Sequence, residues 1–301
     1  MKTLTGVLPI VPTPFAVDGT PDHSSLAKVV DDAIAFGAAA LVYPGVASED
    51  VHLTSEERMA CLDVVVSRTN GRVPVIAGVN TADPAEMVAL AGKVAAQNVQ
   101  AIMAMAVPDM RPDYAGWFHK IEEASGGLPI ILQNLFAPRG ADLSAEEMIA
   151  LAKAVPSIRY VKEEGVPSGI KVSELVAACG PDLDAVIGGG GARYLLEELD
   201  RGAVATMPAI ELLELHVDLM QAYLSGDRDT AKALYVRSLP ILLTQAPFRM
   251  RLTKLILKHR GLVETDIVRE RLPDMDDALK MLIIEFYEEA MSYKTSEASS
   301  D

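Results

Sequence analysis

One lysine in this 301-residue sequence ends a predicted strand, a position where lysine is uncommon. Residues 158–162 read Ile-Arg-Tyr-Val-Lys, a short apolar segment that predicts a β-strand and ends on Lys162. Burying an ammonium group is costly unless the group is paired or gives up its proton. A lysine in this position is therefore a candidate for chemistry.

The chemistry that such a lysine can perform is nucleophilic. A desolvated amine gives up its proton more readily, and the neutral amine can attack a carbonyl carbon to form a Schiff base. The alternative is a structural lysine paired with Glu163 or Glu164. Neighbouring residues of a strand point to opposite faces, so the glutamates could also face away from Lys162.

The elements that would position Lys162 form a regular repeat, in which a short apolar segment is followed by a longer amphipathic one. The apolar segments predict strands of a parallel sheet covered by helices, and the amphipathic segments predict those helices. Eight such pairs fill residues 1–225, which is close to the length of a closed (β/α)8 barrel. An open doubly wound sheet is the competitor, but no dinucleotide-binding fingerprint follows the first strand. The predicted strands are 7–11, 39–43, 73–77, 101–106, 129–132, 158–162, 184–187 and 203–207.

After residue 225 the pattern contains helices alone, over 229–243, 248–260 and 275–293. We therefore predict an α/β fold, a (β/α)8 TIM barrel over residues 1–225, with a C-terminal helical extension over 226–296. Residues 297–301 are small and polar and predict a disordered tail.

The active site of such a barrel lies at the C-terminal ends of its strands. Lys162 ends the sixth predicted strand, and Gln133 ends the fifth. The residues that we expect to bind substrate follow the other strands or the loops after them: Thr13, Gly45, Val46, Ala47, Ser48, Arg139, Gly188 and Met207. The run of glycines at 188–191 could cradle a phosphate, but no lysine and serine pair of the P-loop type follows it, so we interpret it as a tight turn beside a ligand.

Composition excludes several classes of partner. The net charge of −15 argues against nucleic acid and against an acidic membrane surface. The five histidines are scattered without ligand spacing, which predicts no metal site and surface or capping roles for these side chains. Two cysteines without metal or redox spacing, no signal peptide and no apolar run of membrane-spanning length predict a cytoplasmic protein.

Several segments, in this order, resemble the dihydrodipicolinate synthase and N-acetylneuraminate lyase superfamily of lysine-dependent class I aldolases. The resembling segments are 9–14, the loop 45–49 with 53–58, 74–78, 128–134, 160–163 around the lysine, and 202–207. The resemblance covers nearly the whole chain. It implies a (β/α)8 barrel with a helical extension, a Schiff-base role for Lys162, no cofactor beyond that covalent imine, and commonly a homotetramer.

The sequence departs from the superfamily's pattern around the lysine. Val46 and Ala47 stand where members usually carry two hydroxyl residues, so Ser48 and the backbone amides remain to hold a carboxylate. Arg139 matches the family's substrate arginine if one residue is deleted.

The tyrosines of the synthase proton relay are also absent. Gln133 stands in place of the catalytic tyrosine, and Asp109 or Met110 in place of the second one. Proton transfer would then fall to water held by Gln133 and Ser48, or to Tyr43. This environment resembles that of members acting on 2-keto-3-deoxy sugar acids, such as the dehydratase of 2-keto-3-deoxyarabonate.

The sequence thus predicts a lyase that forms a Schiff base with a small 2-oxo acid and either removes water from it or cleaves it. Two alternatives stay open: a synthase-like condensation of pyruvate with an aldehyde, and a catalytically weak relative that only binds a 2-oxo acid.

Overall fold

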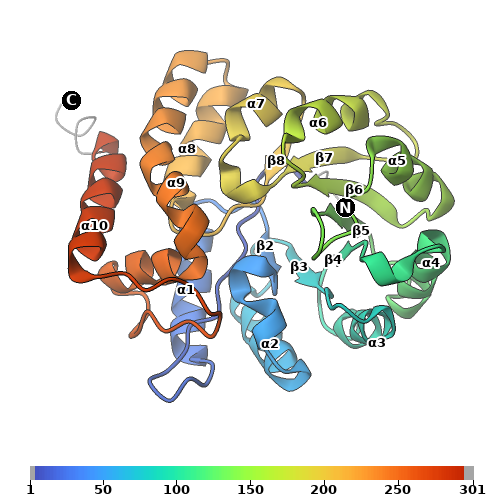
Figure 1. The fold of residues 1–301 in the computed structure, drawn as a ribbon, viewed down its shortest axis with the longest axis horizontal. Helices are drawn as coiled ribbons and strands as arrows, with labels where there is room; N and C mark the ends of the chain where they lie inside the picture. The colour runs from blue at the N-terminus through green and yellow to red at the C-terminus, as the bar shows by residue number, and fades with distance from the viewer. Residues whose placement is uncertain (1–3, 295–301) are drawn as a thin grey trace.

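Eight parallel strands curl into a barrel in the structure, a computed structural model that describes residues 4–294 (Figure 1). The strands follow one another in the order β1-β8-β7-β6-β5-β4-β3-β2, and a parallel bridge between Ile10 and Val42 joins the two ends of that order. The predicted (β/α)8 barrel is confirmed. The strands are β1 (Gly6–Val7), β2 (Leu41–Tyr43), β3 (Val75–Gly78), β4 (Ala101–Met105), β5 (Ile130–Asn134), β6 (Ile158–Glu163), β7 (Ala185–Gly188) and β8 (Ala205–Thr206).

Helices surround the barrel, and a further pair of helices lies at one side of it (Figure 1). The surrounding helices are α1 (His23–Ala35), α2 (Ser55–Thr69), α3 (Pro84–Ala95), α4 (Tyr114–Ala124), α5 (Ala145–Ala154), α6 (Ser168–Ala177), α7 (Leu195–Asp200) and α8 (Leu213–Leu224). The pair at the side consists of α9 (Arg228–His259) and α10 (Asp277–Met291). None of the helices described over residues 4–294 is long and apolar enough to span a bilayer.

Local sequence signals start several of the helices. At α2, the hydroxyl of Thr54 accepts the N–H of Glu57 at 3.1 Å, while the carboxylate of Glu57 accepts the N–H of Thr54 at 2.9 Å. Ser144 and Glu147 make the same capping box at α5. These caps satisfy backbone donors that have no partner within the helix, and so fix where each helix begins.

Side chains of the strands alternate between two apolar cores. The core inside the barrel contains Val42, Ile131 and Tyr160, and the core between strands and helices contains Tyr43, Leu132 and Val161. Because side chains of a strand alternate in direction, Lys162 points to the same side as Tyr160, and Gln133 to the same side as Ile131. Gln133 and Lys162 are also paired in register across β5 and β6. The fold therefore brings these two polar side chains together at the interior end of neighbouring strands.

The two helices predicted at the start of the extension are present, and only the position of the break differs. The helices expected at 229–243 and 248–260 are the two parts of α9, which contains Pro240 and Pro247 and is broken at a non-helical residue, Arg249, with φ 44° and ψ −121°. Proline removes a hydrogen-bond donor and crowds the preceding turn, which accounts for a break at this point of the helix. The predicted tail at 297–301 lies outside the described residues.

One histidine also differs from its expected surface or capping place. His216 lies on α8 and is buried, and burial lowers its pKa to about 4. A neutral imidazole in an apolar setting is the consequence.

The extension is tied to the barrel by a buried ion pair. Lys254 on α9 donates to the carboxylate of Glu49 at 2.5 Å and to the carbonyl of Ile267 at 2.9 Å. The other oxygen of Glu49 accepts the backbone N–H groups of Arg269 and Glu270. Glu49 directly follows the loop of Val46 and Ala47, so α9 and that loop hold each other in place.

The substitution Lys254→Met tests this link. It keeps an apolar stem but leaves the carboxylate of Glu49 buried without its cation, so we expect the free energy of unfolding to fall by about 3–5 kcal/mol in urea denaturation. The control is Lys258→Met on the same helix, whose amine pairs with Asp266 at the surface; there we expect a change below about 1 kcal/mol. Equal, small changes in both variants would show that the buried pair does not anchor the extension.

Candidate active site

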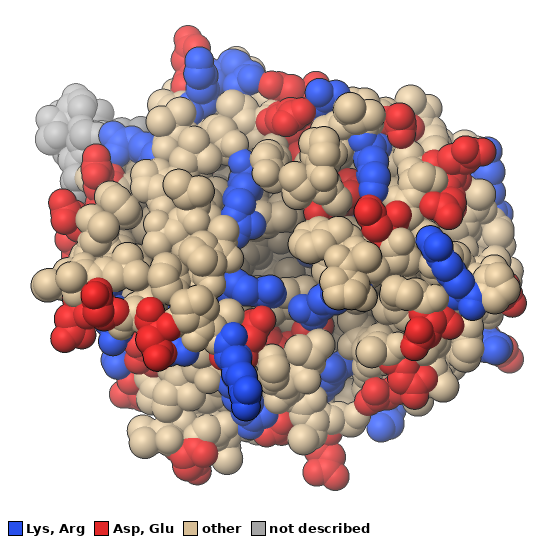
Figure 2. All heavy atoms as spheres, viewed as in Figure 1, with Lys and Arg blue, Asp and Glu red and all other residues tan. Residues whose placement is uncertain are grey.

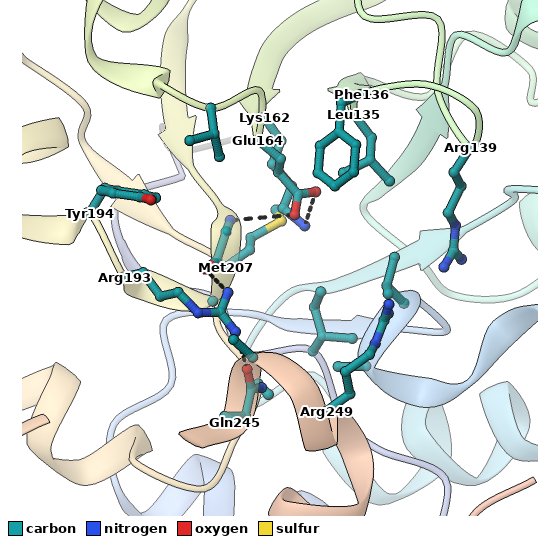
Figure 3. A pocket seen from close by; sticks show the side chains of 18 of the residues that line it. Leu135, Phe136, Arg139, Lys162, Glu164, Arg193, Tyr194, Met207, Gln245 and Arg249 are labelled. Carbon is teal, nitrogen blue, oxygen red and sulfur yellow. Dashed lines mark hydrogen bonds and ion pairs between the residues drawn. The ribbon is translucent and has the colours of Figure 1, made fainter. Parts of the chain in front are cut away.

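A pocket of about 460 Å³ opens at the C-terminal ends of the strands (Figure 3). Its wall comes from four places: the ends of the strands, the loop after β2, the loops after β5, β6 and β7, and the broken part of α9. The residues that line it are Ile10, Val46, Ala47, Leu135, Phe136, Arg139, Lys162, Glu164, Val166, Gly190, Gly191, Arg193, Tyr194, Met207, Ala209, Gln245, Ala246, Arg249 and Met250.

Lys162 and Glu164 form an ion pair inside this pocket. The side chain of Lys162 is 1% exposed, and its Nζ lies 2.8 Å from Oε1 of Glu164. Strand β6 ends at Glu163, and the chain beyond it brings Glu164 back towards the lysine, whereas Glu163 bonds to Asn134 instead. The sequence left open whether a glutamate pairs with Lys162, and the structure answers that Glu164 does.

A directed chain of hydrogen bonds holds the carboxylate of Glu164. The N–H of Met105 donates to Oδ1 of Asn80 at 2.7 Å, and Nδ2 of Asn80 donates to Oε1 of Gln133 at 2.6 Å. Nε2 of Gln133 then donates to Oε1 of Glu164, also at 2.6 Å. Because each amide has its carbonyl occupied, each must present its NH₂ group to the next acceptor, and the chain ends on the carboxylate.

The charge state of Glu164 follows from these partners. Burial acts to raise its pKa, but the positive charge of Lys162 and the hydrogen bonds from Lys162 and Gln133 outweigh burial, and the pKa lies below its usual value. The space for this side chain depends on Gly189, since a Cβ atom there would lie 2.3 Å from Cγ of Glu164. The glycine run thus makes room for an ionised carboxylate beside the lysine.

Several of the predicted site residues do meet in the pocket. Val46, Ala47, Arg139, Lys162 and Met207 all line it. Gln133 is fully buried and reaches the site through Glu164. Arg139 is neutralised by Asp50, whose Oδ1 lies 2.6 Å from Nη2.

Three predicted hydroxyl groups lie outside the pocket lining. Thr13 bonds to the hydroxyl of Tyr43 at 2.9 Å and to the carbonyl of Ser48 at 2.8 Å, and the hydroxyl of Ser48 bonds to Val11 and Gly45. Tyr43 is fully buried in the core between strands and helices, and burial raises its pKa well above 10. These groups brace the loop after β2 from behind. The expectation that Ser48 or Tyr43 handles protons finds no support in this geometry.

Two predicted glycines serve packing. A Cβ on Gly45 would lie 2.9 Å from Cγ2 of Ile10, and one on Gly188 would lie 2.1 Å from Oε2 of Glu198. Neither glycine lines the pocket. Both are needed because other parts of the chain approach their backbone closely.

Sequence reasoning missed five side chains with polar atoms in the lining: Glu164 as a site residue, and Arg193, Tyr194, Gln245 and Arg249 altogether. Arg193 follows the glycine run, which was a usable signal for a ligand nearby. Gln245 and Arg249 come from the extension, and nothing in their helical pattern marks them as facing a barrel.

No group of three or more histidine, cysteine, aspartate or glutamate side chains within residues 4–294 could hold a metal ion. The ion pair of Lys162 and Glu164 in the pocket places an amine beside a carboxylate. Such a pair can exchange a proton and expose a neutral amine to an electrophile.

The family model of the dihydrodipicolinate synthetase family matches residues 3–282. The chain belongs to this family. As a member of it the protein is an enzyme, a lyase of the superfamily that contains dihydrodipicolinate synthases, aldolases and dehydratases.

Two relatives of this chain are named for different activities. The chain is 28% identical to L-2-keto-3-deoxyarabonate dehydratase of Azospirillum brasilense over 90% of this chain and 89% of the relative. It is 29% identical to 4-hydroxy-tetrahydrodipicolinate synthase of Bacillus subtilis strain 168 over 87% and 90%. The two identities are nearly equal, so they do not decide between the two reactions.

Known structures of family members have the same fold. Dihydrodipicolinate synthase from Rhodopseudomonas palustris superposes with a TM-score of 0.87 at 24% identity, covering 95% of this chain and 97% of the other. The sialic acid aldolase of Ruminococcus gnavus superposes with a TM-score of 0.88 at 20% identity, covering 97% and 99%.

Two further carboxyl groups lie buried near the lysine strand. Burial raises the pKa of Glu163 to about 7, against hydrogen bonds from Asn134 and Gly165. Burial also raises the pKa of Glu198 to about 7, against one hydrogen bond from Ser168. Both groups hold protons more tightly in the folded protein than an exposed glutamate does.

Glu198 should therefore weaken the fold as pH rises. Between its ordinary pKa of 4.5 and its folded value of about 7, the folded state binds more protons than the unfolded state, so stability is lost across this window. In the original protein we expect the ionisation of Glu198 to lower the free energy of unfolding by on the order of 3 kcal/mol between pH 5 and pH 8. Glu198→Gln should abolish this decrease, as measured by urea denaturation at each pH.

The control is Glu197→Gln, which changes an exposed neighbour on the same helix. It should keep most of the pH dependence of the original protein, because burial is the main cause of the raised pKa of Glu198 and the charge of Glu197 is the smallest one. A Glu198→Gln variant whose stability also falls in parallel with the original protein would contradict the assignment.

Proposed function

We propose that the protein is a Schiff-base lyase acting on a 2-oxo acid, and that its substrate is a 2-keto-3-deoxy sugar acid such as 2-keto-3-deoxyarabonate. The observation that carries this proposal is the ion pair of Lys162 and Glu164 in the pocket at the ends of the strands. A second support is the 28% identical relative named for dehydration of a 2-keto-3-deoxy acid.

The first step uses the ion pair directly. Glu164 accepts a proton from Lys162, which leaves a neutral amine whose lone pair attacks C2 of the 2-oxo acid. The carbonyl oxygen leaves as water after taking up two protons, and a protonated imine joins Nζ to C2. The reaction needs no cofactor, because the imine itself serves as the electron sink.

The second step uses the carboxylate as a base. In a dehydratase, Glu164 removes a proton from C3, and the electron pair moves into the imine to give an enamine; the hydroxyl on C4 then takes that proton from Glu164 and leaves as water. In an aldolase, Glu164 takes the proton of the C4 hydroxyl instead, and the C3–C4 bond breaks to give an aldehyde and the enamine of pyruvate. Glu164 then returns this proton to C3 of the enamine. In both reactions water hydrolyses the final imine and regenerates Lys162.

The loop after β2 would hold the carboxylate of the substrate. The backbone N–H groups of Val46 and Ala47 have no hydrogen-bond partner among the described residues, and both residues line the pocket. Gly45 and Ser48 shape this loop, with Thr13 behind it. Met207 supplies an apolar wall, and Arg139 lies on the side of the loop after β5.

The condensation of pyruvate with an aldehyde is a second candidate. It is favoured by the 29% identical synthase. The reaction would use the same enamine but requires a proton relay that the pocket supplies here through Glu164 rather than through a tyrosine at position 133. The homotetramer and the cytoplasmic location stay predictions.

Borohydride reduction in the presence of pyruvate tests the first step. We expect intact mass to increase by the reduced pyruvyl group, with the modification on the peptide that contains Lys162, because borohydride traps an imine as a stable amine. Lys162→Ala should show no adduct. The control Lys171→Ala, which removes a surface lysine paired with Asp142, should keep it.

Turnover of a panel of 2-keto-3-deoxy acids, compared with aspartate semialdehyde plus pyruvate, then separates the reactions. Release of a dehydrated product supports the dehydratase, and release of pyruvate supports the aldolase. Adduct formation without turnover of any of these compounds would favour a 2-oxo-acid binder, and an adduct retained in Lys162→Ala would refute the proposed centre.

A further inference from the structure

The pocket gathers positive charge in a protein whose net charge is −15. Figure 2 shows lysine and arginine side chains around the hollow on this face. Three arginines line the pocket: Arg139, Arg193 and Arg249. Arg139 forms an ion pair with Asp50 at 2.6 Å. The two arginines left to consider as binding groups are Arg193 and Arg249.

Arg193 has only neutral partners. Its guanidinium donates to the carbonyls of Leu242 and Gly190 and to Oε1 of Gln245, and no carboxylate of the described residues forms an ion pair with it. A guanidinium has five N–H groups, so these three bonds leave one on each terminal nitrogen. Burial lowers its pKa, Glu211 opposes this, and the charge of Arg249 lowers the pKa further. The charges of Arg193 and Arg249 therefore repel each other. The carboxylates of Glu211 and Glu164 also raise the pKa of Arg193, but neither forms an ion pair with it among the described residues.

Arg249 is held in an unfavourable backbone conformation. Its φ of 44° with ψ of −121° interrupts α9. Such a backbone conformation is unfavourable for any residue that has a Cβ atom. Its Nε lies 3.6 Å from the carboxylate of Glu270, a loose contact, and its side chain is 37% exposed. The break in the helix places this side chain in the pocket wall instead of along the helix surface.

The two arginines lie across the pocket from the reacting lysine. Figure 3 shows Arg193, Gln245 and Arg249 on one side and Lys162 with Glu164 on the other. The C1 carboxylate of a 2-oxo acid is bonded to the imine carbon, so it must lie beside Lys162. Arg193 and Arg249 are therefore available to the part of a bound substrate that extends away from Lys162.

We propose that Arg193 and Arg249 form a subsite for a second anionic group at the end of the substrate remote from the imine carbon. This inference rests on the proposed function and narrows its substrate class. It favours 2-keto-3-deoxy acids derived from sugar diacids, or those with a terminal phosphate ester, over acids that end in a hydroxyl. Guanidinium groups suit either anion, because paired N–H donors match two oxygens of a carboxylate or a phosphate.

Pairs of probes with equal chain length test the subsite. The concentration of 2-oxo acid that gives half-maximal borohydride adduct is measured for 2-oxoglutarate against 2-oxopentanoate, and for 2-oxoadipate against 2-oxohexanoate. We expect the half-maximal concentration of at least one diacid to be roughly tenfold lower than that of its monoacid partner. This is the effect of one or two charge-assisted hydrogen bonds. The pair 2-keto-3-deoxy-6-phosphogluconate and 2-keto-3-deoxygluconate tests a terminal phosphate in the same way.

The variants Arg193→Gln and Arg249→Gln should abolish the preference for the anionic probe while leaving the monoacid within about threefold of its original value. The control Arg237→Gln makes the same charge change at an exposed position of α9 and should leave the preference intact. The matched monoacid also serves as the check that each variant still folds around Lys162.

Two results would overturn the subsite. One is an equal half-maximal concentration for the probes with and without the second anionic group in all three pairs. The other is an equal rise in that concentration for both members of a pair in the arginine variants. The second would assign these arginines to the C1 carboxylate or to folding. Absence of an adduct with every 2-oxo acid, in contrast, would refute the Schiff-base function itself, and the subsite with it.

Discussion

The ion pair between Lys162 and Glu164 is the interaction on which the pocket depends. Taking two charges out of water is costly, and the pair is tolerable only because further hydrogen bonds satisfy the carboxylate. Gln133 supplies one of these, and Asn80 orients Gln133. In the proposed mechanism, a carbonyl substrate replaces this ion pair with a covalent bond to Lys162. On that proposal, the pair both keeps the lysine in a buried place and releases its amine for reaction.

The same pair explains why parts of the chain far apart in sequence are arranged as they are. Gly189 leaves space for Glu164, and the register of β5 on β6 sets Gln133 beside Lys162. On the other side, Glu49 and Lys254 bind the loop after β2 to α9, so that the extension contributes Gln245 and Arg249 to the pocket wall. The extension is in this way a component of the site and not only an addition to the barrel.

The barrel and its lysine could be predicted because their signals are local. Apolar strands and amphipathic helices alternate along the chain, and Lys162 ends one strand. The direction of other side chains was harder to predict. Tyr43 follows Val42, which faces the interior, so the tyrosine faces the helices, and a shift of one residue in the assumed strand would reverse that assignment.

Glu164 and the two arginines show a different limit. Glu164 lies one residue beyond β6, where strand alternation no longer applies and a turn decides the direction of the side chain. Arg193 and Arg249 come from a loop and from a break in a helix, and their approach to the pocket depends on tertiary packing. The resemblance to the superfamily pointed to positions 46, 47 and 133, whereas the carboxylate that we propose as the proton acceptor belongs to Glu164.

The central claim is that Lys162 forms the imine and Glu164 moves the proton, and exchange of the C3 protons of pyruvate in deuterated water tests it most directly. In Glu164→Gln the buried Lys162 loses the anion that stabilises its ammonium form, and burial then favours the neutral amine. We therefore predict that the borohydride adduct still forms, while C3 exchange followed by NMR slows by about 10²-fold or more, the usual loss on removal of a general base. Glu163→Gln, whose side chain bonds to Asn134 outside the pocket, should exchange at nearly the original rate. Undiminished exchange in Glu164→Gln would contradict the account.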